Sequence, residues 1–419
     1  MNQAFFTGIC GLQACQYGID IISHNVSNIN TPGFRGSQIE FSSFFENDIY
    51  SDGLGTPTDN TVGVGVQVQA TPMLQTNGTL IPTDVTTNLA LEGDGWFGIA
   101  TPDGTFYSRS GDFNFDGARS LVNTSGYFAL GTMGSNISNG ILTSELDEVP
   151  LSSVDGQVPL KMPLELYYPV QPTTQAQFFG NLGAENLPRL ASAQLIDSEG
   201  SHNHLALNFT MSTPQPASGT AWDITATVTS NDGSVLYDTQ TGSAVFDEFG
   251  ALVSSSIPNV NNNGSSVSID LGSGYAGLIA NSGSTAGELS SSSNGLEGGE
   301  LVGYDINTNA DIVATFTNGR QSAIGKVAVF HFQNDQGLER ISGTLFRESS
   351  NSGEPIFYTD ANGNPVLGAI TRNAMLENSN IRTDVSLTEL IVMQRSYDAN
   401  AKSITTGDEL IQKALQMDA

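Results

Sequence analysis

The most regular pattern of apolar and polar positions lies near the C-terminus, over residues 386–415. Steps of three and four residues alternate there, through Leu387, Leu390, Gln394, Tyr397, Ala401, Ile404, Asp408, Ile411 and Leu415. Such spacing is typical of the seam of a coiled coil, or of a helix packed among other helices. It predicts a long amphipathic helix at this end of the chain.

A weaker helical pattern covers residues 2–30. Phe5, Ile9, Leu12, Ile19 and Val26 follow one another at spacings of three, four and seven residues, which describes one helix face. Polar Gln16 and Ser23 interrupt that face. The pattern predicts a second terminal helix, and two amphipathic helices at opposite ends of a chain favour pairing with each other.

The residues after this pattern predict where the helix stops. Pro32 disfavours helical backbone at Thr31, and Gly33 suits a turn. Thr31, Pro32, Gly33 and Phe34 therefore form the expected stop and turn.

Between the two helices the pattern changes to that of strands. Residues 62–68 alternate with a period of two, as do residues 113–115. Asp103-Gly104 predicts a hairpin turn between residues 96–99 and 106–107. Further strands are expected at residues 222–228, before an Asn-Asp-Gly turn, and at 326–332. Residues 259–299 are rich in Ser, Gly and Asn, which predicts long loops or a linker.

Together these patterns predict a mainly β protein with terminal α-helices that pair as a coiled-coil-like inner domain. The inner domain would comprise residues 1–34 and 375–419. A β-rich middle domain would comprise residues 35–163 and 303–374, and a β-rich outer domain, residues 164–302, would be inserted in it.

Composition narrows the possible partners. The 46 glycines suit tight turns between strands. The net charge is −29, and no Lys or Arg lies between Arg189 and Arg320, so nucleic acid and anionic lipid are disfavoured as partners. No apolar run approaches the roughly 20 residues that span a bilayer. The N-terminus lacks a basic segment followed by a long apolar one, so export would use a route that reads no cleavable signal.

Candidate chemistry is sparse. His202 and His204 would share one face of a strand, but no nearby Cys or third His completes a metal site. Residues 112–117 mimic a calcium loop that fails at its twelfth position, Asn123. Cys10 and Cys15 would lie about 8–9 Å apart on a helix, too far for a disulfide. We expect no catalytic site, no metal, no cofactor and no small-molecule substrate.

Three motifs at the two ends resemble those of the flagellar rod and hook proteins. They are SHNVSNINTPGFR at residues 23–35, LENSNI at 376–381 and QRSYDANAK at 394–402. Residues 88–97, NLALEGDGWF, resemble a further segment of that family, with Trp96 in place of the usual Phe. Residues 193–202, 315–320 and 334–338 resemble segments of the hook members.

The resemblance implies a structural subunit of the flagellar hook, a flexible tubular polymer outside the cell that joins rod to filament. It also implies export through the flagellar type III apparatus and assembly beneath a hook cap, with further copies of the chain, rod proteins and hook–filament junction proteins as partners. A distal-rod subunit is the alternative, against which the insertion at residues 164–302 argues. A β-rich adhesin would share the composition but would not need the C-terminal seam.

The resemblance also directs attention to the residues that would assemble. The expected inner-helix residues are Leu12, Ile19, Val26, Asn25, Asn28, Asn30, Leu387, Leu390, Gln394, Tyr397, Ala401, Ile404 and Ile411. The three asparagines either cap and turn the chain before Pro32 or bond between subunits. Because both seams contain polar residues, we expect the ends to be disordered in the monomer and to fold on assembly. A helical hairpin already folded in the monomer is the alternative.

Overall fold

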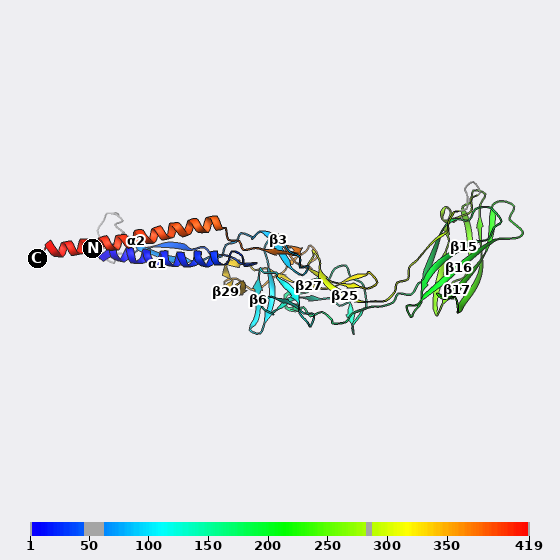
Figure 1. Ribbon diagram of the computed structural model, residues 1–419, viewed down its shortest axis with the longest axis horizontal. Helices are drawn as coiled ribbons and strands as arrows, with labels where there is room; N and C mark the ends of the chain where they lie inside the picture. Colours follow the sequence, from blue (N-terminus) through cyan, green and yellow to red (C-terminus); the bar gives the residue numbers. More distant parts are fainter. Residues whose placement is uncertain (1, 46–62, 282–286, 418–419) are drawn as a thin grey trace.

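The computed structural model describes residues 2–45, 63–281 and 287–417, and the molecule is elongated (Figure 1). Two long helices form one end, a β-rich region lies in the middle, and a second β-rich region forms the far end. This is the predicted class, mainly β with a helix at each terminus. In the part of the chain described, no helix is both long and apolar enough to cross a membrane.

The two terminal helices, α1 (Asn2–Ser27) and α2 (Thr383–Met417), lie side by side. Helix α1 ends three residues before the predicted limit, because side chains already satisfy its last carbonyls: Ser27 Oγ donates to Ser23 O and Asn28 Nδ2 to His24 O. A hairpin of β1 (Glu40–Phe45) and β2 (Gly63–Ala70) also packs on α1. The predicted strand at 62–68 is thus present, with Val62 outside the described residues.

The middle region is built around one large sheet. Its strands follow the order β10-β11-β13-β25-β26-β27-β9-β5-β6-β30-β29. The hairpin predicted at Asp103-Gly104 joins β5 to β6, and Gly104 has a φ of +125°. The bounds are β5 (Trp96–Thr101), β6 (Gly104–Ser108), β9 (Phe128–Met133), β10 (Ile137–Ser138), β11 (Ile141–Leu142), β13 (Tyr167–Tyr168), β25 (Gly299–Ile306), β26 (Asp311–Phe316), β27 (Gln321–Val327), β29 (Glu339–Ser342) and β30 (Leu345–Arg347).

Shorter elements extend this sheet or pair beside it. They are β7 (Phe113–Phe115), β8 (Leu121–Asn123), β12 (Val158–Pro159) and β28 (Val329–Phe330), the pairs β3 (Leu80–Pro82) with β34 (Met375–Glu377), β4 (Leu89–Glu92) with β33 (Ile370–Asn373) and β31 (Tyr358–Thr359) with β32 (Pro365–Val366), and the 3-10 turns Val154–Gly156 and Asp335–Gly337. The pairs β3–β34 and β4–β33 bring the chain that leads into α2 beside residues 80–92.

The outer region consists of two sheets packed on a shared core that includes Phe178, Phe209 and Trp222. One sheet holds β15 (Arg189–Ile196), β16 (His202–Met211), β17 (Thr220–Ser230), β18 (Leu236–Phe246) and β19 (Leu252–Ser256). The other holds β14 (Gln175–Asn181), β20 (Val260–Asn262), β21 (Ser265–Asp270), β22 (Gly272–Ser273), β23 (Ala276–Ile279) and β24 (Ser290–Ser293).

The expectation of long loops or a linker at residues 259–299 is wrong for residues 260–293, whereas residues 294–298 are an extended connection. Strands β20 to β24 occupy about half of this segment, and residues 282–286 lie outside the description. Val260, Val267, Leu271 and Leu278 are buried in the outer core. Ser, Gly and Asn dominate the composition, but these four apolar residues are buried, and three of them lie in the short strands β20, β21 and β23.

The middle and outer cores are separate clusters of buried side chains. Leu166 and Tyr168 pack in the middle core, with half-buried Leu296 and Leu301 against it. All four lie inside the segment predicted as the outer domain, residues 164–302. The predicted domain limits themselves stay a prediction.

Candidate assembly surface and its anchor

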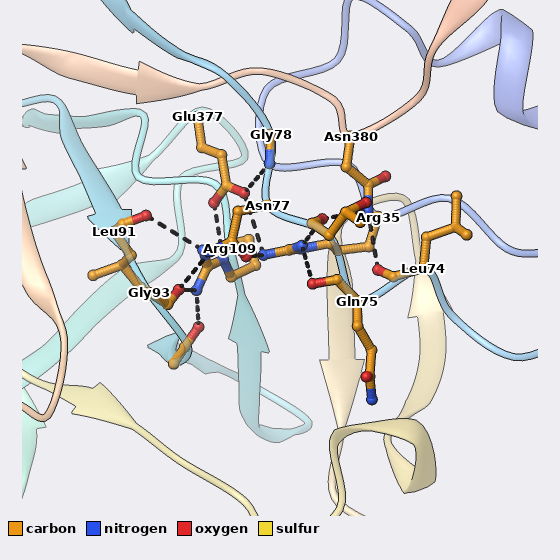
Figure 2. A network of polar contacts seen from close by, with 12 residues as sticks. Arg35, Leu74, Gln75, Asn77, Gly78, Leu91, Gly93, Arg109, Glu377 and Asn380 are labelled. Atoms are coloured by element: carbon orange, nitrogen blue, oxygen red, sulfur yellow. Dashed lines mark hydrogen bonds and ion pairs between the residues drawn. The ribbon is translucent and has the colours of Figure 1, made fainter. Parts of the chain in front are cut away.

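The chain leaving α1 and the chain entering α2 meet at a buried cluster of charges. Glu377, Arg35 and Arg109 are nearly inaccessible to solvent. Glu377 Oε2 accepts a hydrogen bond from Arg109 Nε at 2.9 Å, and its Oε1 lies 3.2 Å from Arg35 Nη2. Figure 2 shows the carboxylate reached by both guanidinium groups. We call these three residues the charge anchor.

Backbone groups complete the polar contacts of the anchor. Arg109 Nη1 donates to Gly95 O at 2.7 Å and to Gly93 O at 2.9 Å. The amide of Gly78 donates to Glu377 Oε1 at 2.8 Å. Since buried charges are tolerated only when they are paired and hydrogen-bonded, the anchor fixes three chain segments relative to one another.

The electrostatics of the anchor follow from its burial. Desolvation, with the charge of Arg109 acting in the same direction, lowers the pKa of Arg35 to about 10, although Glu377 opposes this. Arg35 also donates to Thr76 O, and to Asn77 Oδ1 at 2.8 Å. The guanidinium is therefore cationic at neutral pH and depends on Glu377 for its counter-charge.

Two asparagines from the terminal motifs hold the backbone beside the anchor. Asn380 Oδ1 accepts from Gly36 N at 2.9 Å, and its Nδ2 donates to Leu74 O at 3.0 Å. Asn25 is buried, donating to Ser37 O at 2.7 Å and accepting from Ser37 N at 3.1 Å. Within one chain both asparagines therefore act as backbone clamps.

The predicted stop residues lie beside the charge anchor. We call this place, where residues 33–37, 74–78 and 377–380 meet, the junction. Gly33 has a φ of +68° and donates to Glu377 O at 2.7 Å, and a Cβ at this position would lie 2.3 Å from Ser110 N. Phe34 is buried, with the guanidinium carbon of Arg340 4.8 Å from its ring centroid. Thr31 Oγ1 donates to Asn28 Oδ1 at 3.2 Å, Pro32 is half-buried and the Asn30 side chain is exposed. The stop is thus also an attachment of α1 to the middle region.

Three glycines lie on the face of α1 that meets α2. A Cβ at Gly8 would lie 2.7 Å from Ile404 Cγ1, and one at Gly18 would lie 3.1 Å from Met393 Sδ. A Cβ at Gly11 would lie 2.5 Å from Asn400 Oδ1. The helices therefore approach closely where α1 lacks side chains.

The predicted seam residues fall into two groups. On α2, Leu390, Tyr397, Ala401, Ile404 and Ile411 are half-buried, whereas Leu387 and Gln394 are exposed. On α1, Leu12, Ile19 and Val26 are half-buried beside the glycine face. The contact through these glycines was not predicted, although their spacing at positions 8, 11 and 18 is that of one helix face.

Both cysteines are free thiols, and Cys15 is buried. Burial raises the pKa of Cys15, although a contact from Asn400 Nδ2, 3.8 Å from its sulfur, opposes the rise. A cavity of about 430 Å³ opens beside it between α1, α2 and the β1–β2 hairpin. The helix pair of a single chain is therefore incompletely packed.

Large apolar side chains remain exposed along the helices. The exposed fraction is 45% for Leu387, 53% for Ile391 and 67% for Leu415. Phe6, Tyr17, Val392 and Leu410 are also more than half exposed. Large apolar side chains exposed in this number favour a site that binds another protein surface.

His202 and His204 lie two residues apart on β16 and form no metal site with other described residues. His202 Nε2 instead contacts Glu297 Oε1 at 2.6 Å. Among the described residues, no group of three or more His, Cys, Asp or Glu side chains is arranged to hold a metal ion.

Three stretches of the chain match families of flagellar proteins. Residues 6–35 match the family described as flagella basal body rod protein. Residues 90–150 match the flagellar hook protein FlgE/F/G D1 domain, and residues 372–417 match the C-terminal part of the flagellar basal body rod FlgEFG protein. The first and last matches contain most of both helices and two of the three anchor residues, Arg35 and Glu377.

The similarity extends over the whole chain. The flagellar hook protein FlgE of Borreliella burgdorferi is 27% identical, with 100% of both chains covered. That of Treponema pallidum is 26% identical over 100% of both chains, and that of Salmonella typhimurium is 26% identical over 97% of this chain and 98% of its own. The resemblance read from the motifs is confirmed.

Among solved structures, the Helicobacter pylori flagellar hook protein FlgE2 is similar, with a TM-score of 0.50 and 16% identity. It covers 71% of this chain and 100% of its own. This likeness shows a shared fold.

Proposed function

We propose, from its membership of the family of flagellar hook and rod proteins, that this chain is the structural subunit of a bacterial flagellar hook. The observation that carries the proposal is similarity over the full length to proteins of that name, including the segment between β13 and β25. The exposed apolar surface of α1 and α2 supports assembly, because it gives each copy an area to bury against another.

The finer features of the polymer are part of the same proposal. The terminal helices line its inner channel with coiled-coil-like pairing, and residues Leu387, Leu390, Gln394, Tyr397 and Ile404 contact neighbouring copies. The exposed Asn30 side chain is available for bonds between copies, whereas Asn28 already bonds to His24 O and Thr31 Oγ1 and Asn25 to Ser37 in their own chain. The proposed partners are further copies of the chain, rod proteins, hook–filament junction proteins and a hook cap, and the proposed export route is the flagellar type III apparatus.

A distal-rod subunit is the second candidate, since rod proteins belong to the same family and the matches at residues 6–35 and 372–417 are described as rod protein segments. The outer region argues against it, because the hook relatives align with the chain through that region. Electron microscopy of the purified, polymerised protein separates the two. A hook subunit forms curved tubes and a rod subunit forms straight ones; failure to form any tube under assembling conditions contradicts both.

Two internal replacements test the proposed outer domain. Replacing residues 175–293 by a short Gly/Ser linker leaves Leu166, Tyr168 and Leu296 in place, so the remainder should melt as a folded protein. Replacing residues 164–302 removes those side chains from the middle core, at about 2–5 kcal/mol for each large side chain. Equal melting temperatures for the two variants would contradict the boundary placed at residue 175.

A further inference from the structure

The middle and outer regions are joined by two extended segments, residues 169–174 and 294–298 (Figure 1). Their backbones bridge once, where Gln171 N donates to Leu296 O at 2.9 Å and Leu296 N to Gln171 O at 2.8 Å. The buried cores on the two sides are separate. Polar contacts around this connector therefore control how the outer region sits on the middle one.

A cavity of about 380 Å³ lies at this connector. Gln194, Ile196 and His202 line it from the outer region, residues 293–297 from the connector, and Thr317 and Asn318 from the middle region. Ile196 of the outer region exchanges hydrogen bonds with Thr173 of the connector, Ile196 N donating to Thr173 Oγ1 at 2.8 Å and Thr173 N to Ile196 O at 2.9 Å. Among the described residues, one pair of side chains also crosses from the outer region to the connector: His202 Nε2 to Glu297 Oε1, at 2.6 Å. The backbone of Glu297 is in turn held to the middle region, since Asn318 Nδ2 donates to Glu297 O at 2.9 Å.

We propose that His202 and Glu297 form a proton-controlled latch that closes the outer region onto the connector. The imidazolium makes a charge-assisted bond to the carboxylate, about twice as strong as the neutral bond that remains after deprotonation. The polar contact of this ring is made through Nε2, because Nδ1 is buried with no partner in the described structure. Losing Glu297 therefore removes the contact entirely. The N–H that Nδ1 carries in the imidazolium has no acceptor in the described structure, a cost that reduces the gain from the charged pair.

Few other titratable groups lie near the His202–Glu297 pair. Of the residues that line the cavity, His202 and Glu297 are the titratable ones. Two further carboxylates, Asp197 and Glu199, lie in the turn before β16. Arg320 lies two residues after Asn318, and its Nη1 is 3.8 Å from Glu145 Oε1. Burial acts to raise the pKa of Asp197, but hydrogen bonds from Asn263 and the Ser201 and Glu199 amides lower it overall. Histidine is the side chain whose charge normally changes between about pH 5 and pH 8.

The sign of the effect follows from the charged pair. The charged form of the His202 ring favours the closed latch, and the neutral form favours the open one. The pair is partly exposed, with 34% of the His202 side chain and 54% of the Glu297 side chain accessible, so water weakens it. We expect a shift of about two- to fivefold in the ratio of closed to open molecules. This step rests on the proposed function: in a polymer, every subunit carries the same latch. The movement of each outer region relative to its middle region then depends on pH.

The test measures the spread of distances between the two regions in the full-length monomer. Spin labels are attached through Ser144→Cys in the middle region and Thr225→Cys in the outer region, with Cys10→Ser and Cys15→Ser removing the native thiols. Double electron–electron resonance should give a narrower distribution at about pH 5 than at about pH 8. Glu297→Gln should abolish this difference, and His202→Arg should keep the distribution narrow at both pH values.

His204→Gln, two residues along the same strand, is the matched control and should keep the wild-type response. A wild-type distribution that does not change with pH overturns the latch, as does a pH response that survives Glu297→Gln. Because the measurement uses monomers, its failure is distinct from failure of the proposed function, which electron microscopy of the polymer reports separately.

Discussion

At the junction, Arg35, Arg109 and Glu377 are almost wholly buried and each is held by several hydrogen bonds, whereas along α2 Leu387, Ile391 and Leu415 are about half exposed or more. Both places join the N-terminal part of the chain to the C-terminal part. At the junction, polar groups from residues 33–37, 74–78 and 377–380 are satisfied within one chain. Along the helices, glycines make a close but narrow contact and leave a cavity beside Cys15.

The difference indicates that the junction and the helix pair have separate roles. The junction is complete in the monomer and sets where the helices leave the middle region. The helix pair is incomplete, and its exposed apolar side chains gain stability when other copies cover them. Each prediction below acts on one side of this comparison.

The largest effect is expected at the charge anchor. Glu377→Gln leaves two buried guanidinium groups without their counter-charge, which costs about 3–5 kcal/mol. Urea unfolding of the monomer measures the loss. The matched control is Glu92→Gln, since the Glu92–Arg372 pair is about half exposed and worth at most about 1 kcal/mol. Similar losses for both variants would show that the anchor is an ordinary surface ion pair.

A smaller effect, confined to assembly, is expected on the exposed face of α2. Leu387→Asp should leave monomer stability unchanged, because this side chain is already 45% exposed. In a polymer that buries Leu387, the substitution loses about 1.5–3 kcal/mol per subunit, so the concentration needed for assembly rises more than tenfold. Sedimentation of polymer measures that concentration, with Glu389→Gln as the control near the wild-type value. Normal assembly of Leu387→Asp would place this residue outside the contacts between copies.

The smallest effect on stability is expected from alanine substitution of two glycines, one in each helix. Gly407 faces open space, so Gly407→Ala should stabilise α2 by about 0.5–1 kcal/mol. Gly11→Ala has the same intrinsic gain, but its Cβ would lie 2.5 Å from Asn400 Oδ1 and must displace that side chain. Assembled tubes should therefore dissociate at a higher temperature with Gly407→Ala and at a lower one with Gly11→Ala. A higher temperature for both would contradict the close glycine contact.

Elements that depend on a local sequence pattern were predicted correctly. The terminal helices, the Asp103-Gly104 hairpin and the strand at residues 222–228 follow from periodicity and turn chemistry, and the terminal motifs identified the family. The strands within residues 259–299 were missed because so few of their residues are apolar. Only the paired sheets reveal that Val267 and Leu278 face one core.

The charge anchor was beyond prediction for a different reason. Its three members lie far apart in the sequence, and no local pattern indicates that Glu377 meets both Arg35 and Arg109. The glycines of α1 were not predicted because a coiled-coil seam is recognised by its large apolar residues. A close contact between helices at glycines has no such residues.

Amide hydrogen exchange of the monomer and of the polymer tests most directly whether the junction is complete in one chain and the helices are not. In the monomer, we predict slow exchange at Gly33 and Gly36, whose amides bond to Glu377 O and Asn380 Oδ1, and fast exchange over residues 5–27 and 387–415. In the polymer, both helices should become protected. Slow exchange along both helices in a sample shown to be monomeric would contradict the account, because the helix pair would then be stable without other copies.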